Sequence, residues 1–315
     1  MLNRRHLRIK AFQTIYAFHQ AEVKDRKSFE KTLLDSILSV HKAYIKSLQL
    51  LIELSDFEAM DVEERSSKFL PSEDDLQASA ILQNNQFIQL LKQDATFKDL
   101  LKKYKISWTD ELVLLREIYN KLKADVAYKE YAAKEVKSME VERECINNIY
   151  KNILIPDPLL EQFFEEQFIN WPVDKQSVDG MVLKTVRSFK EQAEKKIDIL
   201  PITANWEEDQ QFALDLYNKT LLNSEDYEKL IADKTQNWEV DRIALVDVIL
   251  MKMAIAELVY FQSIPTKVTM NEYIDISKDF STPKSKSFIN GILDKILIEM
   301  KAEGKIRKIG RGLME

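Results

Sequence analysis

Residues 243–261 read IALVDVILMKMAIAELVYF and form the most apolar stretch of the 315-residue chain. Three charged side chains, Asp247, Lys252 and Glu257, interrupt this stretch at intervals that spread them around the circumference of a helix. Charged groups are expensive inside a membrane-spanning helix, which argues against a membrane span. We therefore expect this stretch to be the central helix of a soluble core, with other helices packed on most of its sides.

The residues after this stretch contain several helix boundary signals. Ile264-Pro265 should stop the central helix, because proline lacks an amide donor and disfavours helical backbone in the residue before it. Residues 269–272 (TMNE) have capping-box spacing and predict a helix from there to about residue 280. Thr282-Pro283 predicts the start of a last helix, which Gly304 should end.

The rest of the chain follows the same helical periodicity. Apolar side chains recur every three or four positions, most regularly over residues 33–52, and no alternating strand-like run occurs. Residues 55–80 carry the weakest pattern, with acidic and serine-rich stretches, and we expect a loop or a set of short helices there. The sequence therefore predicts an all-α protein, whose length suggests about two domains.

A self-comparison reveals an internal similarity at an offset of 67 residues. Residues 170–175 (NWPVDK) match residues 237–242 (NWEVDR), and the same offset aligns further identical residues without a gap. A fixed period is the signature of a repeated structural unit. The similarity reflects either duplication of a helical hairpin or convergence of two helix-start turns. Duplication would make residues 110–195 a degenerate partner of the carboxy-terminal domain.

Composition excludes several kinds of site. The chain has five glycines and cannot build the glycine-rich loop that lets backbone approach a nucleotide phosphate. Cys145 is the single cysteine, and all three histidines lie within residues 1–41, which leaves no disulfide, zinc-site or Cys/His nucleophile pattern. We therefore expect no enzyme, no metal and no cofactor. The amino terminus lacks the apolar core of a signal peptide, so a cytoplasmic location is expected.

The net charge of −6 is unevenly distributed along the chain. Residues 1–10 carry four cations and no acid, residues 301–315 carry five cations against two acids, and the remainder has a net charge of −13. Such asymmetry can mark contact with a nucleic acid or a membrane.

The core face of a first helix would hold Leu7, Phe12, Ile15 and Tyr16.

Arginines at the start of that helix can form a row on its exposed side. These are Arg4, Arg5 and Arg8, three to four residues apart. The arginine fork suits phosphate, so the row could meet successive phosphates of a nucleic acid. A solvated first turn would carry the same residues.

Two blocks of sequence carry a family resemblance. The first is residues 4–17 (RRHLRIKAFQTIYA). The second comprises residues 241–258 (DRIALVDVILMKMAIAEL), 264–273 (IPTKVTMNEY) and 288–295 (FINGILDK). In this order the blocks resemble the bacterial transcription antitermination factor family NusB, and the resemblance covers about residues 1–20 and 207–300.

The resemblance implies an all-helical bundle of the NusB type with a large additional helical insertion. The expected parts are a first helix (1–21), the insertion (22–205, with the degenerate repeat at about 141–187), a helical core (206–300) and a basic tail (301–315). The implied function is to bind the boxA element of ribosomal RNA transcripts together with the small-subunit ribosomal protein NusE, within the RNA polymerase antitermination complex. The alternative is a helical protein-interaction scaffold in which the insertion carries the main role.

The resemblance also implies functional residues, position by position. The RNA-binding residues would be Arg4, Arg5, Arg8, Lys10, Lys252, Lys267, Phe280 and Phe288. Recognition of single-stranded RNA combines cations on the backbone with base stacking on aromatics, although both phenylalanines could equally be core residues. The protein-partner residues would be Asp247 and Lys284, and Asp247 could also be an ordinary helix cap or surface charge.

Several residues depart from the family pattern. Lys284 stands where relatives often carry an acid, which leaves the partner surface open. Lys252 stands where arginine is common, His6 replaces a basic residue, and Ile9 replaces an acid. The basic tail either adds RNA contacts or remains disordered and solubilising.

Overall fold

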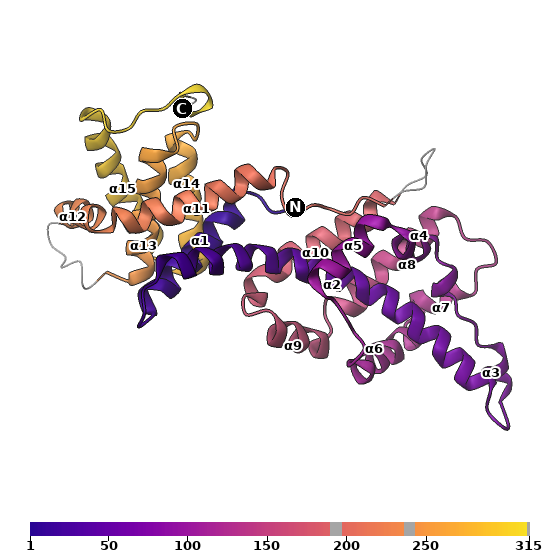
Figure 1. The fold of residues 1–315 in the computed structure, drawn as a ribbon. Coiled ribbons are helices and arrows are strands. Elements are labelled where there is room, and N and C mark those ends of the chain that lie inside the picture. Colours follow the sequence, from indigo (N-terminus) through magenta and orange to yellow (C-terminus); the bar gives the residue numbers. More distant parts are fainter. Residues whose placement is uncertain (190–196, 236–242, 314–315) are drawn as a thin grey trace. The chain divides into compact units, whose positions relative to one another are not determined.

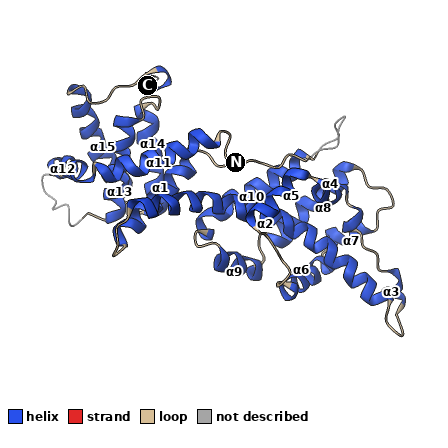
Figure 2. Cartoon of the chain, in the orientation of Figure 1, coloured by secondary structure: helices blue, strands red, loops and turns tan. Residues whose placement is uncertain are grey.

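A computed structural model describes residues 1–189, 197–235 and 243–313. Over these ranges the regular elements are helices, and none of the described residues forms a strand (Figure 2). The all-α prediction is therefore confirmed. In the same ranges, no helix combines the length and the apolar character that crossing a membrane requires.

The chain divides into two compact units, which are described separately. The terminal unit comprises residues 2–37 and 203–315, and the middle unit comprises residues 38–202. The predicted insertion, residues 22–205, differs from the middle unit mainly at its amino-terminal boundary. The first turns of the second helix belong with the terminal unit.

The terminal unit is a bundle that contains the first helix and the last helices of the chain (Figure 1). It also contains the first turns of the 41-residue helix α2. The bounds of its helices are α1 (Arg4–Gln20), α2 (Arg26–Ser66), α11 (Trp206–Leu222), α12 (Ser224–Lys234), α13 (Leu245–Tyr260), α14 (Thr266–Phe280), α15 (Ser285–Ala302) and the short η4 (Gly310–Leu313).

Helix α13 is the centre of the terminal unit, as its apolar sequence predicts. Every residue from Asp247 to Leu258 is buried. Helices α1, α11, α12, α14 and α15 all pack against α13 (Figure 1). A helix that is apolar all round needs neighbours on every side, and these five helices provide them.

Helix α1 begins with a reciprocal cap. The Asn3 side chain accepts a hydrogen bond from the His6 amide, and the His6 ring accepts one from the Asn3 amide. Leu7, Phe12 and Ile15 are buried as predicted, whereas Tyr16 is 38% exposed and its assignment to the core is wrong. Tyr16 lies beside Phe12 at the edge of the buried face, with ring centroids 6.4 Å apart, where its amphipathic ring can remain partly in water.

The predicted capping box at residues 269–272 is wrong. Pro265 separates α13 from α14 as expected, but α14 begins directly after it, at Thr266. Thr269 therefore lies inside the helix, and its hydroxyl donates to the buried Glu257 carboxylate at 2.8 Å. The hydroxyl satisfies a buried carboxylate of the neighbouring helix instead of an orphan amide of its own.

The last helix also begins later than predicted. Helix α15 starts at Ser285, and Thr282-Pro283 forms the turn before it. The Thr282 carbonyl accepts from the Ser285 amide at 2.9 Å, and the two hydroxyls are also 2.9 Å apart. Thr282 therefore supports the helix start from outside, without being its N-cap.

The predicted end of this helix at Gly304 is confirmed. Gly304 has a φ of +67°, the left-handed conformation that glycine adopts at low cost. Its amide donates to the Lys301 carbonyl, and the next amide, of Lys305, donates to the Met300 carbonyl. This is the Schellman arrangement, which satisfies the last carbonyls of a helix.

The middle unit contains the rest of α2 and a series of shorter helices. Its elements are α3 (Glu73–Gln77), η1 (Leu82–Asn84), α4 (Gln86–Gln93), α5 (Ala95–Tyr104), α6 (Leu112–Ala124), α7 (Val126–Ala132), α8 (Met139–Asn148), the π-helical η2 (Ile149–Leu154), α9 (Pro158–Gln167) and α10 (Trp171–Ser188). The prediction of a loop or short helices over residues 55–80 is wrong up to Ser66, because α2 continues through it. Leu54, Phe57 and Glu58 keep one face of α2 buried there, and only the residues beyond Ser66 match the prediction.

Helix bounds follow the offset of 67 residues found in the sequence. Helices α8 and α11 begin 67 residues apart, at Met139 and Trp206. The ends of α9 and α12, at Gln167 and Lys234, are separated by the same number. Residues 237–242 of the matching block lie outside the described residues. Duplication therefore stays a prediction, to which the matching helix bounds add support.

Candidate nucleic-acid interface

The first arginine of α1 is partly exposed and paired with acids. Arg4 forms ion pairs with Glu208 and Asp209 in the first turn of α11, and its side chain is 35% exposed. Its guanidinium also lies over the Phe212 ring, 4.9 Å from the ring centroid. Arg4 therefore bridges the two helix starts without being buried.

Arg5 is paired in the same way with helix α14. It donates to both Glu272 carboxylate oxygens and to Asp275, all at 3.0 Å. Hydrogen bonding to the Lys278 ammonium lowers the pKa of Asp275 below its ordinary value, and Arg5 makes a smaller contribution in the same direction. The Arg5 side chain nevertheless remains 43% exposed. Exposed ion pairs contribute only about 0–1 kcal/mol, so a phosphate could replace these carboxylates at small cost.

Arg8 is a core residue, which contradicts its predicted place in an exposed row. Its side chain is 3% exposed and donates to both oxygens of Glu257, at 2.7 and 2.8 Å. Burial opposes the charge, but hydrogen bonding to Glu257 outweighs it and raises the pKa of Arg8. Thr269 and Tyr273 hydroxyls also donate to Glu257. Arg8 thus ties α1 to α13 and α14, and it cannot reach a phosphate in this arrangement.

Lys10 and Lys252 are also buried, at 2% and 3% exposure. The Lys252 ammonium donates to Glu228 at 2.6 Å and to Ser224 at 2.9 Å, both on α12. Long cationic side chains are almost never buried without such partners. Both lysines are therefore interior residues of the terminal unit, and their contact with RNA stays a prediction.

The remaining predicted RNA-binding residues lie nearer the surface. Lys267 is exposed in the first turn of α14, and no ion pair among the described residues uses it. Phe280 is half-buried, with its ring 5.2 Å from that of Phe12. Phe280 therefore takes part in α1 packing while keeping part of its ring accessible.

The two predicted partner residues and Phe288 line one groove. This groove, of about 320 Å³, is formed by the start of α13 and the α14–α15 turn and is lined by Ile243, Ala244, Asp247, Thr282, Lys284, Ser285 and Phe288. Asp247 is 5% exposed and accepts from the hydroxyls of Ser281, at 2.5 Å, and Ser285, at 2.7 Å. Asp247 therefore connects α13 to the α14–α15 turn. Lys284 is exposed and Phe288 is half-buried, so both side chains are accessible in the groove.

The sequence reasoning missed the acidic partners of the cations. These are Glu208, Asp209, Glu228, Glu257, Glu272 and Asp275. A signal was present, because Glu257 and Glu272 both lie inside the family-like blocks. The Glu257 carboxylate lies in an apolar stretch and is fully buried, so it needs a counter-charge, which Arg8 of α1 provides.

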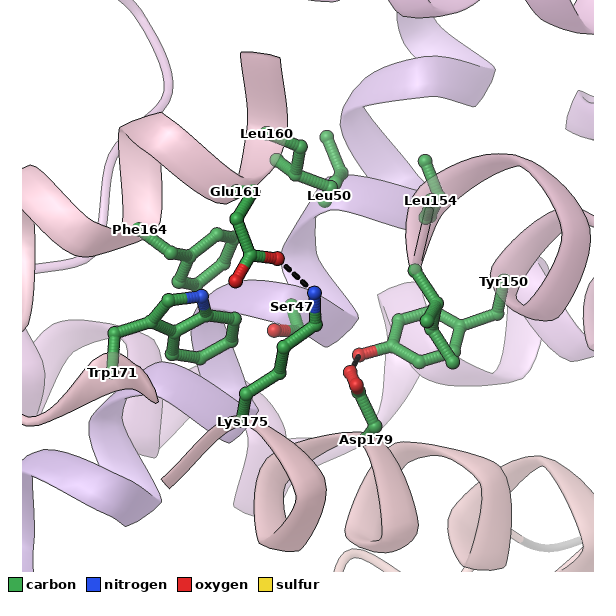
Figure 3. Close-up of a pocket in the computed structure, with 11 residues that line it drawn as sticks. Ser47, Leu50, Tyr150, Leu154, Leu160, Glu161, Phe164, Trp171, Lys175 and Asp179 are labelled. Atoms are coloured by element: carbon green, nitrogen blue, oxygen red, sulfur yellow. Dashed lines mark hydrogen bonds and ion pairs between the residues drawn. The ribbon is translucent and has the colours of Figure 1, made fainter. Parts of the chain in front are cut away.

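The middle unit contains a small cavity (Figure 3). Figure 3 shows Lys175 paired with Glu161, and the Tyr150 hydroxyl donating to Asp179 at 2.8 Å. Burial raises the pKa of Asp179. The cavity measures about 20 Å³, room for about one water molecule, so it is too small for a substrate. Among the described residues, no cluster of His, Cys, Asp and Glu is placed to hold a metal ion.

Comparison with known proteins finds similarity in the carboxy-terminal part of the chain. The NusB family model matches residues 179–297. Relatives named transcription antitermination protein NusB include those of Salinibacter ruber, 42% identical over 103 residues, and Chloroherpeton thalassium, 43% identical over 104 residues. A third, from Geotalea daltonii, is 45% identical over 85 residues.

These similarities cover only part of each protein. The three alignments span 33%, 33% and 27% of this chain, and 64%, 49% and 59% of the respective relatives. The chain thus spans about half to two thirds of the length of the curated relatives it matches. No solved structure is significantly similar to the chain. The matched region contains the α13 core, the groove and most of the acids that pair with α1.

Proposed function

We propose that this chain, whose residues 179–297 match the NusB family model, is an RNA-binding transcription antitermination factor. Its target would be the boxA element of ribosomal RNA transcripts, bound together with the small-subunit ribosomal protein NusE in the cytoplasm. The observation that carries the proposal is the match of residues 179–297 to this family. The basic start of α1 packs directly on that matched domain, against α11 and α13.

The cations best placed for RNA are Arg4, Arg5 and Lys267. All three have accessible side chains in the terminal unit, whereas Arg8, Lys10 and Lys252 serve its interior. Neutralising one phosphate of a single strand contributes about 0.7 to the slope of log affinity against log salt. Three contacts therefore predict a slope of roughly −2. If the RNA instead contacted Arg4, Arg5, Arg8 and Lys10, the four contacts would give a slope of about −3.

The groove beside Asp247 is the proposed contact for NusE. Phe288 and the exposed Lys284 are accessible there, and an aromatic anchor in a groove is a common centre of binding energy. Phe288→Ala should weaken the effect of NusE on RNA affinity without changing the salt slope of the chain alone. Lys284 would favour an acidic group on the partner.

The experiment that tests the function is a titration of boxA RNA at several salt concentrations, with and without NusE. The double variant Arg4→Ala/Arg5→Ala should lower affinity and reduce the slope by about 1.4. Lys286→Ala/Lys295→Ala is the matched control, because it removes two exposed cations of α15 from the same unit. Equal affinities and slopes for the two double variants would exclude this RNA surface.

The alternative function, a protein-interaction scaffold, is favoured by one feature of the middle unit. Phe69 and Leu70, in the loop after α2, are 98% and 84% exposed. Asp75 anchors this loop by accepting from Arg65 and Lys68, at 2.8 and 3.1 Å. A partner bound through this loop would be lost in the full-length Phe69→Ser/Leu70→Ser variant while RNA affinity stayed unchanged.

A further inference from the structure

The basic carboxy-terminal tail folds back onto the terminal unit (Figure 1). The Ile309 amide donates to the Gln262 carbonyl at 3.1 Å, just beyond the end of α13. The Lys308 ammonium donates to the Phe261 carbonyl at 2.9 Å and approaches the Glu257 carbonyl at 3.5 Å. A cation at these positions satisfies the last carbonyls of a helix and suits its dipole. Lys308 therefore caps α13, and the tail has a defined docking site.

Gly312 fits the tail closely against the same turn. A Cβ atom at this position would lie 2.0 Å from the Gln262 carbonyl oxygen. That contact is with backbone, which cannot swing aside as a flexible side chain would. Any residue other than glycine should therefore push the tail off its site, although the charge of the tail would be unchanged.

The docking site connects the tail to the basic start of α1. The Phe261 ring packs against Phe212, with ring centroids 5.1 Å apart. Arg4 lies over that same Phe212 ring, at 4.9 Å from its centroid. Two aromatic rings thus link the arginine helix to the residue whose carbonyl holds Lys308. A short chain of contacts through these rings therefore connects the two basic ends, which the acidic body separates in the sequence.

The tail brings accessible cations to this region. Arg307 is exposed, and none of the ion pairs among the described residues involves it. Lys305 is 55% exposed and forms an ion pair with Glu303, two residues earlier, which is itself 43% exposed. Lys267 is also exposed and follows Gln262 closely in the sequence, at the start of α14. Within the described part of the unit, Arg307 and Lys267 have no ion pair to break before they bind a phosphate.

We propose that the docked tail is part of the RNA-binding surface, with Arg307, Lys267 and Arg4 binding phosphates of one single-stranded RNA. The proposal rests on the proposed function and adds to it a second basic element and its anchor. Lys308 and Gly312 hold the tail, while Arg307 provides the contact. Docking lowers the ordering cost of that contact, since the tail is already fixed before RNA arrives.

Three full-length variants test the proposal by titration of boxA RNA at several salt concentrations. Arg307→Ala should lower affinity about five-fold at 0.1 M salt and reduce the salt slope by about 0.7. Gly312→Ala keeps every charge and should lower affinity about two- to ten-fold by undocking the tail. Hydrogen exchange in residues 305–313 should report that undocking directly. Lys295→Ala is the control, an exposed cation of α15 that should leave affinity and slope unchanged.

The outcomes separate the proposal from the function on which it rests. Wild-type chain that fails to bind RNA with a salt-dependent affinity would overturn the proposed function itself. Wild-type binding with an unaltered Arg307→Ala variant would overturn the role of the tail and leave the function standing. A loss in Arg307→Ala without a loss in an undocked Gly312→Ala variant would show a loose polycation, and would overturn the docked surface.

Discussion

Replacing Arg8 with alanine should destabilise the terminal unit by about 3–5 kcal/mol, because it leaves a buried carboxylate without its counter-charge. The guanidinium donates to both Glu257 oxygens at 2.7 and 2.8 Å, and the two side chains are 3% and 0% exposed. After the substitution Glu257 would retain the hydroxyls of Thr269 and Tyr273, which are neutral donors. Two neutral hydrogen bonds do not replace a bidentate ion pair inside a core.

Urea unfolding followed by hydrogen exchange in α13 is the appropriate assay. It reads the terminal unit alone, since a chain of two units need not unfold in one step. Arg4→Ala is the matched control, because its ion pairs are partly exposed and should contribute about 0–1 kcal/mol. The double variant Arg8→Met/Glu257→Met should recover most of the loss, since no unpaired charge would remain. A cost for Arg8→Ala no larger than that for Arg4→Ala would refute the reasoning.

Three further predictions follow from buried groups. Lys252→Met should lower the free energy of unfolding by about 1–3 kcal/mol, because the ion pair with Glu228 is lost. Titrations of boxA RNA should show unchanged affinity and salt slope. A reduced slope would show that Lys252 contacts RNA. Burial raises the pKa of the Cys145 thiol, so a thiol reagent at pH 8 should label the native chain only as the middle unit opens, and rapid labelling without urea would contradict this. Burial also raises the pKa of Glu58 above its ordinary 4.5, so the folded state keeps a proton that the unfolded state releases. The urea midpoint of the middle unit should therefore fall as the pH rises above 4.5. Glu58→Gln should make that midpoint less dependent on pH.

The sequence predicted the helices whose signals are local and apolar. The run around α13 and the glycine after α15 were identified correctly, because burial on all sides and a left-handed C-cap each leave a mark in a few adjacent residues. The capping box predicted at Thr269 is wrong because the Thr269 hydroxyl donates to Glu257 on a neighbouring helix. Local sequence does not reveal such a long-range hydrogen bond. Acid-rich residues after Leu54 hid the continuation of α2, since a polar composition does not reveal that one face remains buried.

The candidate site was predictable in location but not in the role of each residue. Arg4, Arg5 and Arg8 lie within five positions and have the same side chain, yet only Arg8 points into the core. Helical spacing alone could place all three on an outer row, and the choice depends on where Glu257 and Glu272 lie in space. The tail was equally undetermined, because its anchor is a pair of backbone carbonyls, which carry no sequence signal.

The charges of α13 explain how so apolar a helix keeps one set of neighbours. Asp247, Lys252 and Glu257 are five residues apart, which turns each about 140° from the last and places the three on different sides of the helix. Asp247 binds the hydroxyls of Ser281 and Ser285, Lys252 binds α12, and Glu257 binds α1 and α14. An apolar surface alone would tolerate rotation or sliding, whereas a misplaced buried charge loses its partner at a cost of several kcal/mol. Arg8, which the sequence assigned to RNA, thus makes one of the three contacts that orient the core. The proposed RNA surface then consists of the exposed cations of the terminal unit.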